Sequence, residues 1–480
     1  MHRRHFITSA SLATAAGELA RGAQERTKMS ERPNFLFLIA DDLTYRSIHS
    51  LNNKEVDTPN LDRLVREGTC FTHCFHQGSW SAAVCVPSRV MLNSGVSAFR
   101  AQKLLDSVPL WGQSLGRAGY ETYIVGKWHL DPTALQRSFK QMGPIGPGMF
   151  ESTPDAYHRP SPGNHWSPSD KSLKGHWLDT GLWLNAPHSE MRHSCSIWAS
   201  EAVEHLTKVV PQQQTPFFMY AGFNEPHDPR QSPREYLDKY PQAKIEIPPN
   251  YLPEHPFNEG DHMIRDELLA PFPRTKEAVR LHRSEYYALI SYLDHQVGEI
   301  LEALERSGKA ANTYVILTAD HGLAVGEHGL MGKQNMYDHS IRMPLLIRGP
   351  GIAKGKRIDE LVYQHSLFAT TCELAGVPAP STVEFPSLAG LLRDRQSKGQ
   401  EAVFCYYKNF QRAVRTKQHK LIVYPQVSMV QLFDMVNDPW ETRNLASDPK
   451  YTSIKNDLMQ RLQQIRMELG DPLLGADDKS

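Results

Sequence analysis

The sequence predicts an α/β protein with two domains of unequal size. Short apolar runs, of the kind that form strands buried on both faces, alternate with segments of helical periodicity. This alternation is typical of a mostly parallel central sheet flanked by helices. After a proline-containing stretch at residues 378–381, the pattern changes to a hairpin and one last helix. We therefore expect a large domain at residues 30–385 and a small C-terminal α+β domain with an antiparallel sheet at residues 386–480.

Four apolar runs predict the central strands, and each run ends in polar residues. The runs and the polar residues after them are 34–40 with 41–42, 121–125 with 126–129, 216–222 with 224–227, and 313–319 with 320–322. In open α/β sheets, ligands bind beyond the carboxyl ends of the strands. Four polar clusters at that edge predict a metal-centred active site.

Helix signals lie between and after these runs. Residues 61–68 follow Thr58-Pro59, a start signal with proline in the first turn. Residues 284–307 carry apolar side chains at helical spacing and stop before Gly308. The predicted hairpin covers residues 413–424, and the last helix is expected at about residues 453–468.

Composition excludes several classes of protein. Lys+Arg and Asp+Glu are equal at 53 each, so the formal net charge is zero, and no basic run offers a surface for nucleic acid. No apolar stretch approaches the roughly 18 residues of a membrane span. Six cysteines in 480 residues do not make a disulfide scaffold. Cys70 and Cys74 either pair or are two buried thiols.

The first 28 residues are interpreted as a targeting segment and excluded from the fold. Arg3-Arg4 precede a mild apolar run rich in Ala, Ser and Thr, which resembles a bacterial twin-arginine export signal. That signal predicts an exported protein, periplasmic or extracellular. The alternative is that translation begins at Met29, just before the first strand.

The most specific motif is Cys85-Val-Pro-Ser-Arg89. Pro87 suits the first turn of a helix, so Cys85 is expected at a helix N-terminus, where backbone N–H groups favour anions. A thiol placed there has a lowered pKa and can act as a nucleophile. The alternative from the residues alone is a buried structural cysteine.

The Cys85 motif resembles the signature of type I sulfatases, which have the alkaline-phosphatase superfold. Further stretches stand in the order found in that family, and they are most similar to polysaccharide and iduronate-type sulfatases. They are Asp41-Asp42, Gly126–His129, Pro226–Pro229, Asp320–Gly322, Gly326–Lys333 and Leu432–Leu445.

The resemblance implies a sulfatase whose Cys85 is converted to 3-oxoalanine (formylglycine) by a sulfatase-maturing enzyme. The hydrated aldehyde would be the nucleophile. The positions that match the family's catalytic residues are Cys85, Arg89, Lys127, His129, His227 and Lys333.

Three carboxylates predict the metal. Asp41, Asp42 and Asp320 offer oxygen ligands that suit a hard cation such as Ca²⁺ or Mg²⁺. His321 would add one nitrogen ligand, which keeps Mn²⁺ or Zn²⁺ open, and the residue at position 85 would complete the site.

The expected substrate is a sulfated carbohydrate. Aromatic and basic groups suit a sugar, and the candidates for contact are Arg46, His76, Trp80, Asn224 and Arg230. Two alternatives remain open. One is a phosphonate monoester or phosphodiester hydrolase of the same family, and the other is a catalytically dead protein that binds sulfated glycans.

Overall fold

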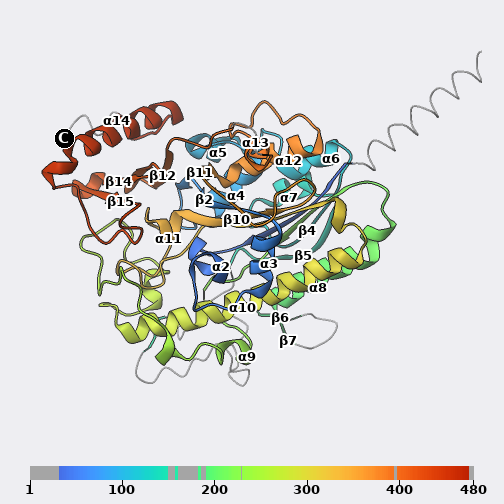
Figure 1. Ribbon diagram of the computed structural model, residues 1–480, viewed down its shortest axis with the longest axis horizontal. Helices are drawn as coiled ribbons and strands as arrows, with labels where there is room; N and C mark the ends of the chain where they lie inside the picture. Colours follow the sequence, from blue (N-terminus) through green and yellow to red (C-terminus); the bar gives the residue numbers. More distant parts are fainter. Residues whose placement is uncertain are drawn as a thin grey trace, which may run out of the picture.

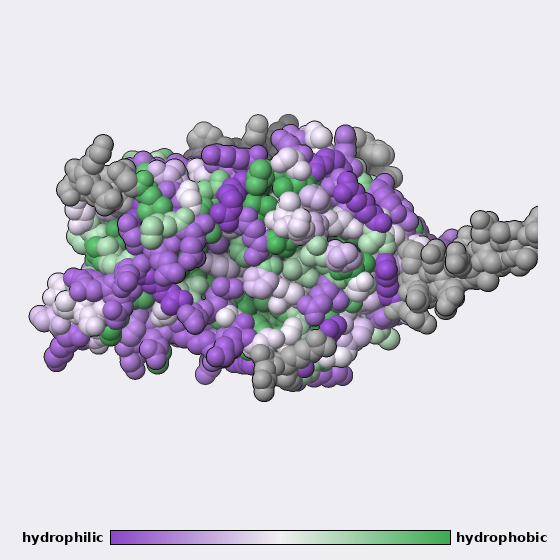
Figure 2. All heavy atoms as spheres, turned by 90° about the horizontal axis from the view of Figure 1, so that it is seen from above, coloured by the Kyte–Doolittle hydropathy of each residue, from purple (hydrophilic) through white to green (hydrophobic). Residues whose placement is uncertain are grey.

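The computed structural model describes residues 32–149, 157–160, 182–184, 191–228, 230–393 and 397–474. The predicted export signal lies outside these residues. Within them, no helix is both long and apolar enough to cross a membrane. On the face seen in Figure 2, hydrophilic side chains are interspersed with apolar ones.

An eight-stranded sheet forms the centre of the large part of the chain (Figure 1). All neighbouring strands pair in parallel except β10, which is antiparallel to β2 and β9. In spatial order the strands are β11 (Lys356–Tyr363), β2 (Thr69–Phe75), β10 (Arg342–Arg348), β9 (Thr313–Ala319), β1 (Asn34–Ala40), β8 (Phe217–Gly222), β4 (Glu121–Lys127) and β5 (Gln141–Gly146). The predicted mostly parallel sheet is confirmed.

Helices cover both faces of this sheet, as Figure 1 shows. One layer contains α2 (His49–Asn52), α3 (Pro59–Glu67), α8 (Ser194–Glu204), α9 (Arg234–Leu237) and α10 (Lys276–Arg306). The other contains α4 (Cys85–Ser94), α6 (Trp111–Arg117), α7 (Pro132–Ser138), α12 (Leu367–Ala375) and α13 (Ala389–Leu392). Further short elements are the helices α5 (Ala98–Leu104) and α11 (Asp338–Ile341) and a two-stranded sheet of β6 (Leu182–Leu184) and β7 (Met191–His193).

The central strands are apolar because both their faces are buried. Every residue of β1 is at most 5% exposed, and the Phe37 ring packs edge-on against Trp111 at 4.9 Å between centroids. Burying one such aromatic side chain stabilises the fold by about 1.5–3 kcal/mol. Cys70 and Cys74 are free, buried thiols on β2, so the alternative of a disulfide between them is wrong.

A second sheet lies under the last helix, α14 (Thr452–Leu469) (Figure 1). Its strands are β15 (Met429–Asp434), β14 (His419–Tyr424), β13 (Gln411–Arg415), β12 (Val403–Tyr407) and β3 (Gly78–Ser79). The four C-terminal strands are antiparallel, as predicted. Because β3 comes from the N-terminal part, this sheet has strands on both sides of the boundary expected at residue 385, which stays a prediction.

A buried charge network joins this second sheet to α11, the short helix before β10. The Lys420 Nζ on β14 lies 2.8 Å from Asp338 Oδ1 and also pairs with Glu441. Arg415 Nε lies 3.2 Å from Asp338 Oδ1. Burial acts to raise the pKa of Asp338, but Arg415 and Lys420 outweigh it and hold that pKa well below the usual value. The network therefore consists of compensated charges that cannot be removed singly without cost.

We expect Lys420→Met to lower the free energy of unfolding by about 3–5 kcal/mol, because it leaves two buried carboxylates short of a cation. The matched control is Lys417→Met, since the Lys417 side chain is 44% exposed and pairs with Glu360 near the surface. That change should cost no more than about 1 kcal/mol. Urea unfolding of both variants checks the prediction, and equal losses would contradict it.

Candidate active site

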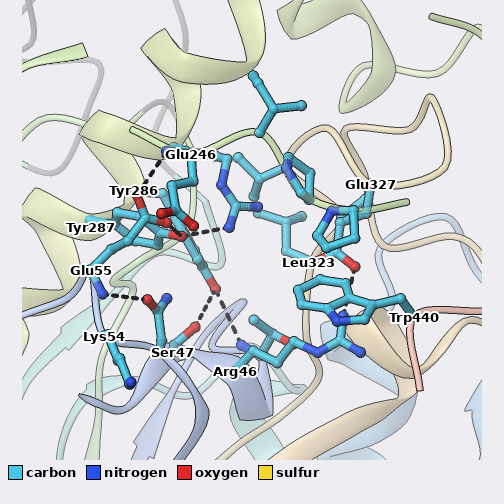
Figure 3. A pocket seen from close by; sticks show the side chains of 18 residues that line it. Arg46, Ser47, Lys54, Glu55, Glu246, Tyr286, Tyr287, Leu323, Glu327 and Trp440 are labelled. Atoms are coloured by element: carbon cyan, nitrogen blue, oxygen red, sulfur yellow. Dashed lines mark hydrogen bonds and ion pairs between the residues drawn. The ribbon is translucent and has the colours of Figure 1, made fainter. Parts of the chain in front are cut away.

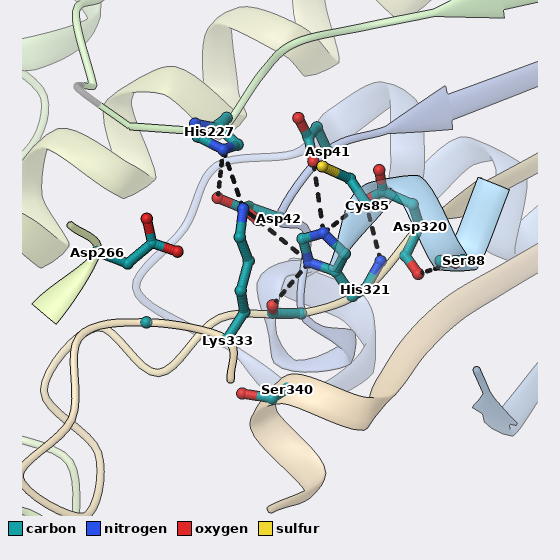
Figure 4. Close-up of polar contacts among 12 residues, drawn as sticks. Asp41, Asp42, Cys85, Ser88, His227, Asp266, Asp320, His321, Lys333 and Ser340 are labelled. Atoms are coloured by element: carbon teal, nitrogen blue, oxygen red, sulfur yellow. Dashed lines mark hydrogen bonds and ion pairs between the residues drawn. The ribbon is translucent and has the colours of Figure 1, made fainter. Parts of the chain in front are cut away.

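The polar clusters meet at one edge of the central sheet because their strands are parallel neighbours. Ala40 of β1 is in register with Ala319 of β9, so Asp41 and Asp320 follow side by side. Gly222 of β8 is in register with Gly126 of β4, which brings the chain after each of these strands to the same edge. Figure 4 shows the resulting group of side chains.

Four potential metal ligands converge here. One atom each of Asp41, Cys85, Asp320 and His321 lies within 4.8 Å of the others, and all four residues are buried. His321 Nδ1 lies 3.1 Å from the Gly322 carbonyl oxygen, which can only accept a hydrogen bond. Nδ1 therefore carries a proton, and Nε2 is the ring nitrogen that remains for another partner.

His321 Nε2 faces two carboxylates. His321 Nε2 lies 3.5 Å from Asp320 Oδ1 and 3.7 Å from Asp41 Oδ1. Neither Nε2 nor Asp41 Oδ1 has a hydrogen-bond partner. Buried acceptors that face one another need a positive charge between them. The donor set therefore fits a divalent cation.

Asp42 contributes a further carboxylate from an unusual backbone conformation. Its φ is +68°, in the left-handed region that aspartate tolerates better than most residues. Its backbone carbonyl accepts a hydrogen bond of 2.6 Å from the Tyr286 hydroxyl. Burial raises the pKa of Asp42 well above its usual value, against the opposing charge of Lys333. A bound cation would favour the ionised form of this carboxyl group.

Each carboxylate of the cluster is paired with one cation. Lys127 Nζ forms an ion pair with Asp41. Arg89 Nε donates to Asp320 Oδ2 at 2.9 Å, and Lys333 Nζ donates to Asp42 Oδ1 at 2.9 Å. When all three carboxylates are ionised, as a bound cation would favour for Asp42, the three side-chain cations cancel their charge.

Two of these pairs hold carboxylates ionised. Burial and the nearby Asp320 act to raise the pKa of Asp41, but Lys127 and other cations hold it below the usual value. Burial likewise opposes ionisation of Asp320, yet His321 and Arg89 bring its pKa far below the ordinary value. Both side chains are therefore available as anionic ligands at neutral pH.

Cys85 is the first residue of α4 and is 2% exposed. Its Sγ lies 3.1 Å from His129 Nδ1. Burial, helped by Lys127, lowers the pKa of His129 to about 3, so this imidazole is neutral at neutral pH and can accept a proton. The arrangement places a base directly beside the atom at position 85.

His227 and Lys333 form the opposite side of the cluster. His227 Nδ1 lies 2.7 Å from the Asp228 backbone carbonyl, so Nδ1 carries the proton. Burial and Lys333 keep the pKa of His227 well below its usual value, so the ring is neutral. Its Nε2 accepts a hydrogen bond of 2.9 Å from Lys333 Nζ. Lys333 is the group of this pair that has a proton to give.

The structure thus brings together all the residues predicted as catalytic or metal-binding. Of these ten residues, His129 and His227 are the two that are partly exposed, and the other eight are buried. The mouth of the site therefore lies beside these two histidines.

The five predicted substrate contacts lie in different places. His76 is buried, with its ring centroid 6.3 Å from that of His321. Asn224 donates to the Pro147 carbonyl at 3.1 Å, and buried Arg230 lies 3.3 Å from His282 Nδ1 through its Nη1. Trp80 packs against apolar clusters beside the second sheet. Arg46 forms an ion pair with Glu327 and lines a cavity beside the catalytic cluster. The five side chains are therefore held by partners other than Cys85.

Sequence reasoning missed residues that surround the cluster from distant loops. The Asp266 carboxylate points toward Lys333 in Figure 4 and helps to raise its pKa, against burial. Arg265 pairs with Asp228, next to His227. Gly148 lies against the His129 ring, where an added Cβ would come within 2.1 Å of Cδ2. No motif marks these three loop positions.

In a second group of potential ligands, two members are engaged in hydrogen bonds, whereas neither ring nitrogen of His339 has a hydrogen-bond partner among the described residues. Single atoms of Glu327, His328 and His339 lie within 4.8 Å of one another. The Asn250 amide nitrogen, however, donates to Glu327 Oε2 at 2.9 Å and lies 3.3 Å from His328 Nδ1. Arg46 donates to the same Glu327 oxygen. Glu327 and His328 are therefore held by Asn250 and Arg46.

Comparisons with known proteins agree with the geometry. The family model "Sulfatase" matches residues 33–377, and the model "N-sulphoglucosamine sulphohydrolase, C-terminal" matches residues 326–468. An arylsulfatase of Clostridium perfringens is 26% identical over 481 residues, covering 93% of this chain and 95% of its own. Iduronate 2-sulfatase of Mus musculus is 28% identical over 420 residues, covering 76% and 72%.

Two solved structures show the same fold. One is a protein in complex with its substrate D-glucosamine-2-N,6-O-disulfate, with a TM-score of 0.70 and 21% identity, covering 94% of this chain and 100% of that chain. The other is the phosphonate monoester hydrolase of Silicibacter pomeroyi, with a TM-score of 0.72 and 21% identity, covering 92% and 97%. Because the first family model spans well over half of the sequence, the chain belongs to the sulfatase family and is a sulfuric ester hydrolase.

Proposed function

We propose that this sulfatase hydrolyses O-sulfate esters of a carbohydrate. Its nucleophile would be a formylglycine made from Cys85, and its cofactor a divalent cation, with Ca²⁺ as the first candidate. Mg²⁺ and Mn²⁺ are the other candidates. The observation that carries the proposal is the position of Cys85 at the start of α4. There it touches the base His129 and belongs to the same group of ligands as Asp41, Asp320 and His321.

The charges of the site favour an anionic substrate. The three carboxylates and three cations cancel, so a divalent cation would leave the buried site with an excess of two positive charges. A sulfate monoester carries one negative charge, and its leaving oxygen becomes more negative as the S–O bond breaks. Fixed positive charges in a buried site stabilise that change better than water does.

The side chains have different roles in the proposed reaction, according to their positions. The mature position 85 would supply an aldehyde hydrate as nucleophile, and the cation, held by Asp41, Asp42, Asp320 and His321, would polarise a sulfate oxygen. Neutral His129 is placed to take a proton from the group at position 85.

Proton donation comes from the other side of the cluster. Lys333 carries the proton available to the leaving oxygen, while His227 accepts its hydrogen bond and fixes its direction. Arg89 and Lys127 hold the carboxylates of Asp320 and Asp41 in place. The proton donor and the base therefore stand on opposite sides of the reacting group.

The carbohydrate part of the proposal is supported by relatives. The C-terminal family model is named for N-sulphoglucosamine, one relative is named for iduronate, and one structural neighbour holds a sulfated glucosamine. The phosphonate monoester hydrolase neighbour keeps that reaction as the second candidate. The complete set of proton-transfer and ligand residues speaks against a dead glycan-binding protein. Export to the periplasm or beyond, and maturation by a sulfatase-maturing enzyme, are further parts of this proposal.

We expect Cys85→Ala to abolish turnover of 4-nitrophenyl sulfate while leaving the thermal unfolding curve unchanged, because only the nucleophile is lost. In wild-type protein co-expressed with a sulfatase-maturing enzyme, mass spectrometry of the peptide across Cys85 should show formylglycine.

Activity of the Cys85→Ala protein near that of wild type would refute the mechanism. A higher kcat/KM of the wild type on a 4-nitrophenyl phosphonate monoester than on the sulfate would favour the second candidate.

Calcium should stabilise the folded wild type. At roughly 100 times its Kd, Ca²⁺ is expected to raise the free energy of unfolding of EGTA-treated protein by about 2.7 kcal/mol. Asp320→Asn should lose this increment together with activity, because it removes an ionised ligand. Asp359→Asn is the control, since that side chain is 79% exposed. Thermal unfolding with and without Ca²⁺ measures the stabilisation of each variant. Equal stabilisation of both variants would rule out Asp320 as a ligand.

Gly148→Ala should lower kcat on the order of 10²-fold, the effect of displacing a catalytic group by about 1 Å. The new methyl group would overlap the His129 ring, which must then move away from position 85. Gly116→Ala is the matched control, because its nearest neighbour would lie 3.6 Å away. Steady-state kinetics of both variants test this, and an unchanged kcat for Gly148→Ala would show that His129 is not held by this contact.

A further inference from the structure

A cavity of about 480 Å³ lies beside the catalytic cluster but contains none of its residues. It is bounded by the loop that follows Asp42, by α10 and by the loop that follows His321 (Figure 3). Tyr286 forms part of the wall, and its hydroxyl donates to the Asp42 carbonyl at 2.6 Å. The cavity is thus a separate compartment on the α10 side of the cation site. Its volume falls in the range of small-ligand sites, about 300–1,000 Å³.

The charges that line this cavity cancel. Three cations and three carboxylates face it, and they are Arg46, Lys54, Arg283, Glu55, Glu246 and Glu327. Two of them are already paired with each other, since Arg46 Nη1 donates to Glu327 Oε2 at 2.9 Å. In contrast to the catalytic cluster, nothing here implies an added cation. The lining therefore has no excess charge to attract a sulfate or carboxylate, and it favours a neutral ligand.

The same lining offers many hydrogen-bonding groups to a polar ligand. Two polar atoms of the lining are buried without any hydrogen-bond partner: the Thr44 hydroxyl, in a residue that is 6% exposed, and Arg283 Nε. Buried polar atoms are normally satisfied by protein, water or ligand. Ser47, which is 1% exposed, adds a further hydroxyl at the floor.

Aromatic and apolar side chains form the remaining walls. Figure 3 shows Tyr286 and Tyr287 on one side of the cavity and Trp440 on the other. The Arg46 guanidinium lies over the Trp440 ring, 3.6 Å from its centroid, which fixes that ring. Rigid rings combined with planar charged groups match the alternating C–H faces and hydroxyl edges of a sugar ring. The opening lies at the exposed residues Lys54, Glu246 and Pro249.

We propose that this cavity is a second, non-catalytic binding site for an uncharged sugar unit. It goes beyond the proposed function and does not require that the substrate be a carbohydrate. The occupant is either a free neutral sugar or an unsulfated unit of a longer glycan, because both present the same hydroxylated ring.

The test is saturation-transfer NMR with the Cys85→Ala protein, which cannot turn over a ligand. The probes are methyl β-D-galactopyranoside, methyl β-D-glucopyranoside, their unsulfated β-linked tetrasaccharides and galactose 6-sulfate. At least one neutral monosaccharide or tetrasaccharide should bind saturably. Tighter binding of the tetrasaccharide would identify a glycan unit as the occupant, and equal binding a free sugar.

Two variants locate the binding. Glu246→Ala removes a carboxylate at the rim and Trp440→Ala removes one wall, and each should weaken binding of the neutral sugar by about tenfold. Glu235→Ala is the matched control, because Glu235 is exposed and lies outside the cavity. The Glu246→Ala variant in the active background should hydrolyse 4-nitrophenyl sulfate like wild type, so this test can fail while the sulfatase proposal stands.

Three results would overturn the proposal. They are no saturable binding by any neutral probe, equal binding by the Glu246→Ala and Glu235→Ala proteins, and a preference of the cavity for galactose 6-sulfate that Glu246→Ala alters.

Discussion

The structure is organised around three carboxylates buried at one edge of a parallel sheet. Because β1 pairs with β9, Asp41 and Asp320 leave the sheet side by side. Two neighbouring negative charges are stable in a buried site only when positive charges compensate them. Lys127, Lys333 and Arg89 come from three other segments to supply it. The neighbouring backbone is arranged around these carboxylates. Asp42 has a left-handed backbone conformation, and the Tyr286 hydroxyl donates a hydrogen bond to its carbonyl oxygen. The first turn of α4 packs against the same carboxylates.

The same requirement extends outward to the second sheet. Lys333 pairs with Asp42 from the loop that leads into α11, and α11 is held at its first residue, Asp338, by Lys420 and Arg415 of the C-terminal strands. The C-terminal sheet is therefore part of the support of the active site. Its strand β3, which comes from just before Cys85, ties the nucleophile's own segment to the same sheet. The second sheet therefore takes strands from both sides of the boundary predicted at residue 385.

Local signals determined how much could be predicted. β1 and β9 are continuous apolar runs, and their predicted bounds agree with the structure. β2, β10 and β11 were not predicted, because they contain interior polar residues or arginines at their ends, and β3 has only two residues. The site residues that follow strands could be located because strand direction fixes where they emerge. Gly148, Asp266 and Arg265 could not, since their positions depend on loops that are placed only by tertiary contacts. Arg46 lies near a motif, but the partners that fix its guanidinium, Glu327 and Trp440, are distant in the sequence, and its contact with substrate stays a prediction.

Charge balance also separates the two compartments on either side of the Asp42 loop. In the catalytic cluster, three cations face three carboxylates, and the unpartnered atoms Asp41 Oδ1 and His321 Nε2 fit an additional cation, which would leave the site positive toward a sulfate ester. In the neighbouring cavity lined by Trp440, three cations again cancel three carboxylates. Its unsatisfied atoms are the Thr44 hydroxyl and the Arg283 Nε–H group, and a hydroxylated neutral molecule can satisfy both. The loss of a sulfate group changes a sugar from the first kind of ligand to the second. The two compartments therefore favour ligands of different charge, although they are neighbours: Tyr286 lines the cavity, and its hydroxyl donates to the Asp42 carbonyl.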